Sequence, residues 1–466
     1  MAKARRKISR RAFVKGSLVG LASLALSSLK PLRTARALSR DLSDKWEEEA
    51  ESLALTIRPS KRPKRSFVVS DLPSGRSTSK DCRNALQKTI DKVAKDGGGR
   101  VVIPPGEWFI KGPLRLETNI ELHLSQGSQL TFSENPTDYL PVALTRWEGV
   151  EAYTISSLIY ARSACNVAIT GEGTISGNGA LARRSGMTQS GFDQDKLRVM
   201  GDEGVPTAER IFGEGHILPP PLIQFHDCEA ALVEGVRIID MPFWGVHILY
   251  SSDVTIRGVS VDSMFGNNDG VDIDSSRRVL VENCSFITGD DCVAIKSGRD
   301  ADGRKVGRPS EDIVVRNCHM KVGSSGGVAI GSEMSGGVSN VYVLRCKMDR
   351  VGGALNIKSN LDRGGYVARI RMAKVSIEEC DTVFGVTTKY HSYRGGRFSP
   401  KISDVSVADV WCQSAREGVS IVTEPERPAE GISLHSLRID HVVEPITLQN
   451  AAAISLSKVT MNGHEV

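Results

Sequence analysis

Residues 267–297 read NNDGVDIDSSRRVLVENCSFITGDDCVAIKS, and this stretch contains two copies of one nine-residue pattern, NNDGVDIDS and GDDCVAIKS. Two more copies follow at 324–332 (SSGGVAIGS) and 351–359 (VGGALNIKS), and every copy ends in an apolar–x–Ile–x–Ser strand. The copies begin 22, 35 and 27 residues apart, and periods in this range are typical of solenoids. Because short strands alternate with Gly, Asn and Ser corners and no helical periodicity intervenes, we expect an all-β fold, a right-handed single-stranded parallel β-helix.

Alternation along these strands predicts which side chains face the interior of each coil. The fifth and seventh residues of every copy are apolar and should point inward, so the sixth and eighth should point outward. The outward positions hold charged or small residues, among them Asp272, Asp274, Lys296, Asn356 and Lys358. Such a face suits an open groove for a polar polymer.

Three acidic residues occupy the same corner of neighbouring coils. Asp269 lies in the first copy, and Asp290 and Asp291 lie in the second. Adjacent strands of a sheet are about 4.8 Å apart, so these carboxylates should crowd into one patch. Their mutual repulsion is costly, and closely placed carboxylates are also what acid–base hydrolysis of a glycosidic bond needs.

The cysteines follow the same register and predict structure rather than chemistry. Four of them recur at equivalent positions of successive coils: Cys284, Cys318, Cys346 and Cys380. We expect a stack of small buried thiols, because a free cysteine behaves as a small apolar residue. None of the nine cysteines has a metal-ligand spacing such as CxxC, so we predict neither a metal nor another cofactor.

The N-terminus predicts export. Residues 9–15 (SRRAFVK) form a twin-arginine motif, an apolar stretch at 16–28 follows, and 35–37 (ARA) offers a cleavage site. That stretch is too short to span a bilayer, which takes about 20 residues, so we predict a Tat signal peptide over 1–37, no membrane anchor in the mature chain, and a periplasmic or extracellular location. Its removal takes away ten Lys/Arg and no acid, which changes the net charge from +5 to −5 and argues against nucleic acid.

The mature chain is predicted to be one domain. Residues 38–65 are charged and interrupted by proline, and we expect a flexible lead-in there. Residues 81–95 have the apolar spacing of an amphipathic helix, with Leu86, Ile90 and Val93 on one face. A helix at this point would cap the first coil of a β-helix domain over 66–466, which we expect to be monomeric.

Four motifs in register with the repeat carry a resemblance to a known family: NNDG at 267–270, GDD at 289–291, GSEMSGG at 331–337, and NIK at 356–358 followed by RGG at 363–365. In this order they resemble the family 28 glycoside hydrolases, the polygalacturonase-like pectin hydrolases. The resemblance implies inverting hydrolysis of α-linked galacturonic acid in pectic poly- or oligosaccharides. It implies Asp290 as general acid, Asp269 and Asp291 as the pair that holds the attacking water, and Lys358 as a ligand of the substrate carboxylate. We also expect His247 either to line the groove as a substrate ligand or to be a hydrogen-bonded structural histidine.

Two departures from the family pattern affect the expected substrate. The family commonly has Gly-His-Gly where this chain has SSG at 324–326, and Arg-Ile-Lys where it has NIK. Ser325 and Asn356 therefore replace a histidine and an arginine that would contact a uronate, so we expect poor activity on unmodified polygalacturonate and better activity beside a neutral or decorated unit, such as rhamnose in rhamnogalacturonan. A calcium-dependent pectate lyase and a non-catalytic carbohydrate-binding β-helix remain alternatives.

Two further groups of residues outside the repeat are candidates for the site. Trp147 and Glu148, with Tyr153 nearby, lie on a long segment that could reach over the groove as a wall for the substrate. Arg299 and Asp300 follow the second copy on a loop and could equally form a surface ion pair.

Overall fold

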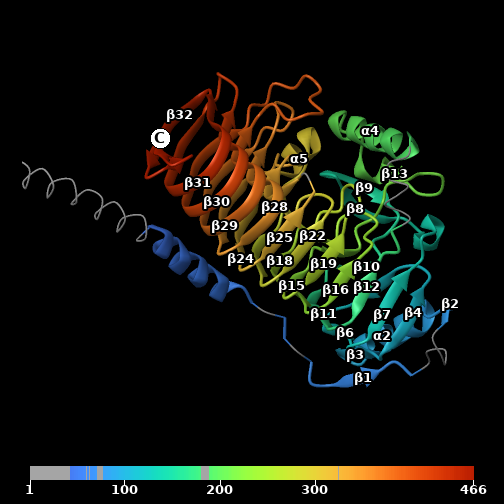
Figure 1. Ribbon diagram of the computed structural model, residues 1–466. Helices are drawn as coiled ribbons and strands as arrows, with labels where there is room; N and C mark the ends of the chain where they lie inside the picture. The colour runs from blue at the N-terminus through green and yellow to red at the C-terminus, as the bar shows by residue number, and fades with distance from the viewer. Residues whose placement is uncertain (1–41, 59, 62, 71–76, 180–187, 324) are drawn as a thin grey trace, which may run out of the picture.

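The computed structural model describes residues 42–466 except 59, 62, 71–76, 180–187 and 324, and it shows one long parallel β-helix (Figure 1). The predicted repeat sets its register: Ile273, Ile295, Ile330 and Ile357 are partners on four successive strands. These inward residues are fully buried, as the alternation predicts. The predicted signal peptide at 1–37 lies outside the described residues.

Three faces of strands build the coils. The face that carries the motifs comprises β5 (Leu114–Leu116), β10 (Ile159–Arg162), β14 (Ile223–His226), β17 (Val246–Leu249), β20 (Val271–Asp274), β23 (Val293–Lys296), β26 (Gly326–Gly331) and the end of β28 (Lys347–Lys358). The second comprises β1 (Ser66–Val68), β3 (Gly99–Ile103), β6 (Ile120–Leu124), β11 (Cys165–Gly171), β15 (Glu229–Glu234), β18 (Ser252–Arg257), β21 (Arg277–Glu282), β24 (Ser310–Arg316), β27 (Val338–Leu344) and the start of β29 (Tyr366–Thr387). The third comprises β2 (Ser77–Asp81), β4 (Gly106–Ile110), β7 (Ser128–Phe132), β12 (Thr174–Ser176), β16 (Arg237–Ile239), β19 (Ser260–Ser263), β22 (Ser285–Thr288), β25 (His319–Val322) and the start of β28.

The last coils are longer and close the C-terminal end. There β29, β30 (Lys401–Val422) and β31 (Ala429–Gln449) follow one another, and β32 (Ala451–Ser457), β33 (Thr460–Met461) and β34 (His464–Glu465) finish the chain. At the other end α2 (Arg83–Lys95) covers the first coil through buried Leu86, Ile90 and Val93, so the predicted capping helix is confirmed.

A few elements depart from the coils on the side of the motif-bearing face (Figure 1). The strands β8 (Ala143–Trp147) and β9 (Val150–Thr154) form an antiparallel hairpin, and β13 (Ile211–Phe212) extends it. The helices are α4 (Thr188–Asp202), α5 (Asp300–Val306) and two 3₁₀ turns, η1 (Pro136–Tyr139) and η2 (Thr207–Glu209). Contacts of α4 with α5 and with β9 hold this group together above the coils.

Stacked thiols fill part of the interior as predicted. Cys284, Cys318, Cys346 and Cys380 are all buried, and the Sγ atom of Cys380 lies 3.9 Å from that of Cys412. All nine cysteines are free, and only Cys165 is exposed. The predicted structural role of the cysteine ladder is therefore confirmed.

The lead-in differs from the expectation of a flexible segment. Residues 42–56 form a helix whose Trp46 and Ala50, with the following Ile57, pack on outward-facing apolar residues of the second face, Leu280, Val314, Tyr342, Leu344, Ala373 and Ala408. Acidic residues beside that apolar stripe bind basic residues of the coils: Glu51 lies 2.6 Å from Arg316 and 3.2 Å from Arg345. Burial of the tryptophan and these ion pairs fix the segment. No helix among the described residues is long and apolar enough to cross a membrane.

Candidate active site

The three acidic residues singled out in the sequence meet at one corner. Asp269 precedes β20, Asp290 and Asp291 precede β23, and one carboxylate oxygen from each lies within 4.8 Å of the other two. Asp269 and Asp291 are only 3% and 2% exposed, whereas Asp290 is partly exposed. Asp290 is therefore the carboxyl group of the three that a bound ligand can touch directly.

Glycines and an asparagine explain why the corner forms at these motifs. A Cβ atom on Gly270 would lie 2.5 Å from the Cys292 carbonyl oxygen, and one on Gly289 would lie 1.9 Å from that of Phe265. Asn268 is buried, donates hydrogen bonds to two backbone carbonyls and accepts one from the Ser263 hydroxyl at 2.6 Å. The NxDG and GDD motifs thus bring two coils close enough for their carboxylates to meet.

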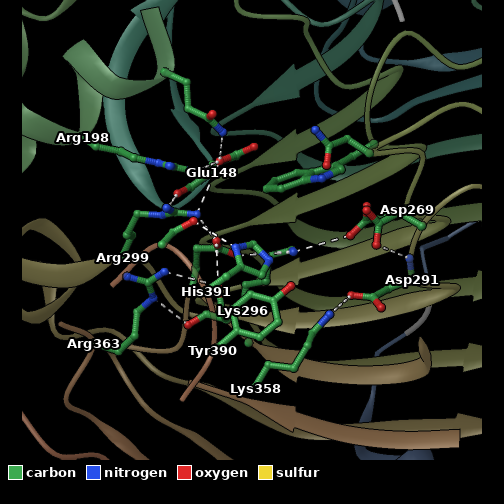
Figure 2. A pocket seen from close by; sticks show the side chains of 18 residues that line it. Glu148, Arg198, Asp269, Asp291, Lys296, Arg299, Lys358, Arg363, Tyr390 and His391 are labelled. Atoms are coloured by element: carbon green, nitrogen blue, oxygen red, sulfur yellow. Dashed lines mark hydrogen bonds and ion pairs between the residues drawn. The ribbon is translucent and has the colours of Figure 1, made fainter. Parts of the chain in front are cut away.

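Two lysines neutralise part of this negative charge (Figure 2). The Lys358 ammonium lies 2.7 Å from Asp291, which also accepts a 2.6 Å hydrogen bond from the Gly326 backbone N–H. Burial lowers the pKa of Lys358, but the Asp291 carboxylate more than offsets this and the pKa is raised overall. Asp291 is thus held by one ammonium group and one backbone N–H donor.

Lys296 sits beneath the corner and corrects the prediction of an open groove. It points away from the coil interior, as the alternation predicts, yet its side chain is only 7% exposed. Its Nζ atom lies 3.5 Å from Asp269, 3.4 Å from Asp272 and 3.4 Å from Glu333. Asp272 and Asp274 are likewise fully buried. The hairpin and α4 cover this part of the face, so the site is a pocket rather than an open groove.

Burial is the main cause of the raised pKa values of Asp290, Asp269 and Asp272. Burial and then the Asp291 charge raise the pKa of Asp290, while Lys358 and a hydrogen bond from Ser325 lower it. Burial also raises the pKa of Asp269 and of Asp272 well above the usual range. The corner therefore combines a partly exposed Asp290 whose pKa is raised with a buried Asp291 that is paired with Lys358, an arrangement that suits acid–base catalysis.

The pocket has a volume of about 240 Å³, and its walls come from outside the repeats (Figure 2). Its charged and aromatic lining comprises Glu148 at the turn of the hairpin, Arg198 of α4, Trp244, Arg299, Glu333, Arg363, Tyr390 and His391. Arg198 donates a 2.8 Å hydrogen bond to Glu148, and Arg299 donates one of 3.0 Å to the Glu148 backbone and pairs with Glu333. These contacts fix the hairpin as one wall of the pocket.

Comparison with known proteins decides the family. The profile described as Glycosyl hydrolases family 28 matches residues 110–457 of the chain. The chain belongs to glycosyl hydrolase family 28. Over 369 residues, 76% of this chain and 70% of its relative, it is 26% identical to a probable polygalacturonase of Vitis vinifera. It is 25% identical over 375 residues to an endo-polygalacturonase of Pectobacterium carotovorum subsp. carotovorum, covering 78% of this chain and 85% of that one.

A solved structure gives a closer likeness to this family 28 chain. The crystal structure of a hyperthermoactive exopolygalacturonase from Thermotoga maritima is 35% identical, with a TM-score of 0.84 over 91% of this chain and 97% of that one. The chain is thus a glycoside hydrolase of the polygalacturonase type, and the predicted family, fold and enzyme class are confirmed.

Two predicted substrate ligands of the family 28 chain lie elsewhere than expected. His247 is completely buried, lies 2.9 Å from Gln224 through Nδ1 and 3.6 Å from Asp274 through Nε2, and does not line the pocket. Its outward position on β17 is covered by the hairpin, so the expected contact with the groove is wrong. Asn356 folds over the backbone of Gly353 and Gly385 and is not part of the pocket lining either.

The structure also shows where the other residues predicted for the enzyme's site lie. Ser325 lies beside Asp290, and Lys358 lines the pocket. The expected wall is present, but only Glu148 of it lines the pocket; Trp147 is buried and stacks on Phe243 with ring centroids 5.3 Å apart. Arg299 and Asp300 are buried and pair with pocket residues, so they are not a surface ion pair.

Several pocket residues of the enzyme were not predicted from the sequence. Glu333 and Arg363 belong to the GSEMSGG and RGG motifs, which were recognised without a role for these side chains. Arg198, Tyr390 and His391 come from α4 and from the segment between β29 and β30, which carry no repeat. The motifs could have indicated a role for Glu333 and Arg363, whereas no sequence pattern indicated the other three residues.

The hydrogen bond from Ser325 leads to a prediction about pH. A general acid must be protonated, so turnover should fall as the pH rises through the raised pKa of Asp290. Because the Ser325 hydroxyl lowers that pKa, Ser325→Ala should move the alkaline limb of the kcat profile to higher pH. Ser332→Ala is the control, since Ser332 lines the same pocket but bonds Glu333 instead. Equal profiles for wild type and Ser325→Ala would contradict this prediction.

Proposed function

We propose that this enzyme hydrolyses α-linked galacturonides from a chain end, with inversion at the anomeric carbon. The observation that carries the proposal is the corner of three acids inside a pocket walled by the hairpin. A wall across the motif-bearing face leaves room for the end of a chain but not for a chain running through. The likeness to an exopolygalacturonase over nearly the full length of both chains supports action at a chain end.

The chemistry follows from the different surroundings of the acids. Asp290 donates its proton to the glycosidic oxygen as the bond from that oxygen to the anomeric carbon breaks. Asp291, with Asp269 beside it, takes a proton from a water molecule, and the water oxygen forms the new bond to the anomeric carbon. The products are a free galacturonate and a shortened chain, and exchange with solvent removes the proton from Asp291 and returns one to Asp290.

Access to the carboxylates supports inversion. Their nearest oxygens are closer than the about 6.5–9.5 Å typical of inverting glycosidases, a spacing that by itself resembles that of retaining enzymes. A retaining enzyme, however, needs a carboxylate that bonds directly to the sugar. Asp269 and Asp291 are almost fully buried and engaged by Lys296 and Lys358, so they are placed to reach a small water molecule rather than a sugar carbon.

The pocket supplies cations that the sequence comparison implied were missing. Arg198, Arg299 and Arg363 all line it in addition to Lys358. These groups can offset the absence of a histidine at 325 and an arginine at 356, because charge-assisted hydrogen bonds hold a carboxylate well. We therefore propose an unmodified galacturonate as the terminal unit, in place of the decorated unit expected from the sequence.

Product analysis tests this function. Polygalacturonate and a rhamnogalacturonan should each be incubated with the enzyme, and early products separated by anion-exchange chromatography. We expect faster release from polygalacturonate, with monogalacturonate as the first product. A ladder of longer oligomers at early times would contradict action at chain ends, and preference for the rhamnogalacturonan would restore the expectation drawn from the sequence.

A chelator distinguishes hydrolysis from the calcium-dependent lyase. The ammonium groups of Lys358 and Lys296 lie 2.7 Å from Asp291 and 3.5 Å from Asp269, and a cation at these positions disfavours a second, divalent one. We expect activity to be unchanged after dialysis against EDTA, with no ultraviolet absorbance from unsaturated products. Loss of activity that calcium restores would favour the lyase, and saccharide binding without turnover would favour a non-catalytic binding protein.

We also propose that the chain is exported by the twin-arginine route and acts as a monomer in the periplasm or outside the cell. The signal peptide predicted over 1–37 supports the route, and the nine free thiols suit a protein that is exported already folded. Cell fractionation after Arg10→Lys with Arg11→Lys tests the export. Retention of the variant in the cytoplasm is expected, and unchanged export would contradict it.

A further inference from the structure

A second cavity lies on the same face of the β-helix, on the other side of the hairpin. It has a volume of about 360 Å³ and is lined by strand β10, strand β14 and the residues at the base of the β8–β9 hairpin. Strand β10 is three strands before β20, the strand that follows Asp269, which corresponds to about 14 Å along the axis. The hairpin therefore separates this cavity from the catalytic pocket.

The cavity presents a cation without a counterion. Arg162 lies at the end of β10 with an exposed side chain, and among the described residues no carboxylate pairs with it. The other guanidinium of the lining, that of Arg115, is neutralised by Glu117 at 2.7 Å. A free guanidinium in a polar cavity suits a planar anion such as a carboxylate, which it can bind through two hydrogen bonds.

The cavity also presents a buried hydrogen-bonding atom that has no partner. His226 is 7% exposed, its ring donates to the backbone of Leu144, and its Nδ1 atom has no hydrogen-bond partner. Burial, followed by the nearby Arg162 charge, lowers the pKa of His226 to about 4, so the ring is neutral near pH 7. With one nitrogen donating to a carbonyl, the other is an acceptor that a hydroxyl group would satisfy.

We propose that this cavity is a second saccharide site, which binds a uronate unit of a galacturonide away from the catalytic pocket. Arg162 takes the carboxylate, His226 accepts from a sugar hydroxyl, and Tyr160 on β10 offers a ring against which a sugar can lie. The inference rests on the proposed function for the class of sugar. Because the hairpin stands between the two cavities, the second site holds another saccharide segment than the one being cleaved.

Calorimetric titration of the Asp290→Asn enzyme with trigalacturonate tests this site. Two binding events are expected. Adding Arg162→Ala should weaken one of them at least tenfold, because a charge-assisted hydrogen bond is lost. Adding Lys358→Ala should weaken the other instead. Arg350→Ala, an exposed arginine on β28 away from both cavities, is the matched control and should change neither.

The outcomes separate this inference from the proposed function. A single event that responds to Lys358→Ala but not to Arg162→Ala would overturn the second site and leave the proposed function intact. A neutral trisaccharide that binds the second site as well as trigalacturonate does would overturn its assignment to uronates. No binding at all, with no turnover by the wild type, would refute both.

Discussion

Replacing Asp290 with asparagine is expected to lower kcat by about 10²–10⁴-fold, the range that positioned proton transfer contributes. Asp290 is the only partly exposed acid of the corner, and burial together with the Asp291 charge raises its pKa. It accepts a 2.9 Å hydrogen bond from the Asp291 backbone N–H and another from Ser325, and an amide oxygen can accept such bonds as well. The variant should therefore keep its circular dichroism spectrum and lose turnover, measured as released reducing ends.

Asp272→Asn is the matched control for this experiment. Asp272 belongs to the same cluster, but it is fully buried and cannot touch the glycosidic oxygen. Burial raises its pKa well above the usual range, so the substitution replaces one neutral group by another of the same shape. We expect this variant to stay within about tenfold of the wild-type rate, less than any role in proton transfer would cost. If Asp290→Asn folds and keeps more than a tenth of that rate, Asp290 is not the acid.

Replacing Lys296 with methionine is expected to destabilise the protein by about 3–5 kcal/mol, the usual cost of removing one partner from a buried ion pair. The ammonium lies within 3.5 Å of Asp269, Asp272 and Glu333, all of them buried. Without it, the Glu333 carboxylate, whose pKa is well below its usual range, loses a compensating charge at 3.4 Å, and Asp269 and Asp272 lose a cation that lowers their pKa values. The urea concentration at the midpoint of unfolding should fall clearly. The value of kcat should fall as well, because Lys296 contributes to the pKa values of Asp269 and Asp290.

Lys347→Met shows whether the effect comes from burial. Lys347 also pairs with two carboxylates, Asp349 and Glu378, each at 2.9 Å, but its side chain is about half exposed. Exposed ion pairs contribute little to stability, so this variant should unfold near the wild-type midpoint. Equal shifts for the two variants would contradict the view that Lys296 holds the corner together.

The repeat made the fold and the meeting of the acids predictable. Side chains alternate along a strand with a period of two, so the apolar–x–Ile–x–Ser pattern specifies both the interior and the register. Once the copies stack, Asp269 must lie next to Asp290 and Asp291, and Cys284 next to Cys318. These predictions depend on spacing along the sequence alone, which explains their success.

What covers the coils was not predictable in the same way. Alternation places Lys296 and His247 on the outer face but cannot reveal that the hairpin and α4 bury them. Glu148 and Arg198 reach the pocket through segments that do not repeat, and their positions depend on contacts formed only in the folded chain. The helix at 42–56 is short and would be only marginally stable alone. It is ordered because it packs on outward-facing apolar residues of the coils such as Val314, and the sequence does not reveal which segment covers them.

The stereochemistry of the first product tests the central claim, inverting hydrolysis by the acid corner, most directly. Proton NMR should follow trigalacturonate with wild-type enzyme from the first minutes, before the anomers of the released sugar equilibrate. We predict that galacturonate appears first as the β anomer, because water attacks the α-linked carbon from the opposite side. First appearance of the α anomer would mean a covalent glycosyl-enzyme intermediate and a carboxylate nucleophile, and would contradict the proposal that Asp269 and Asp291 act on a water molecule.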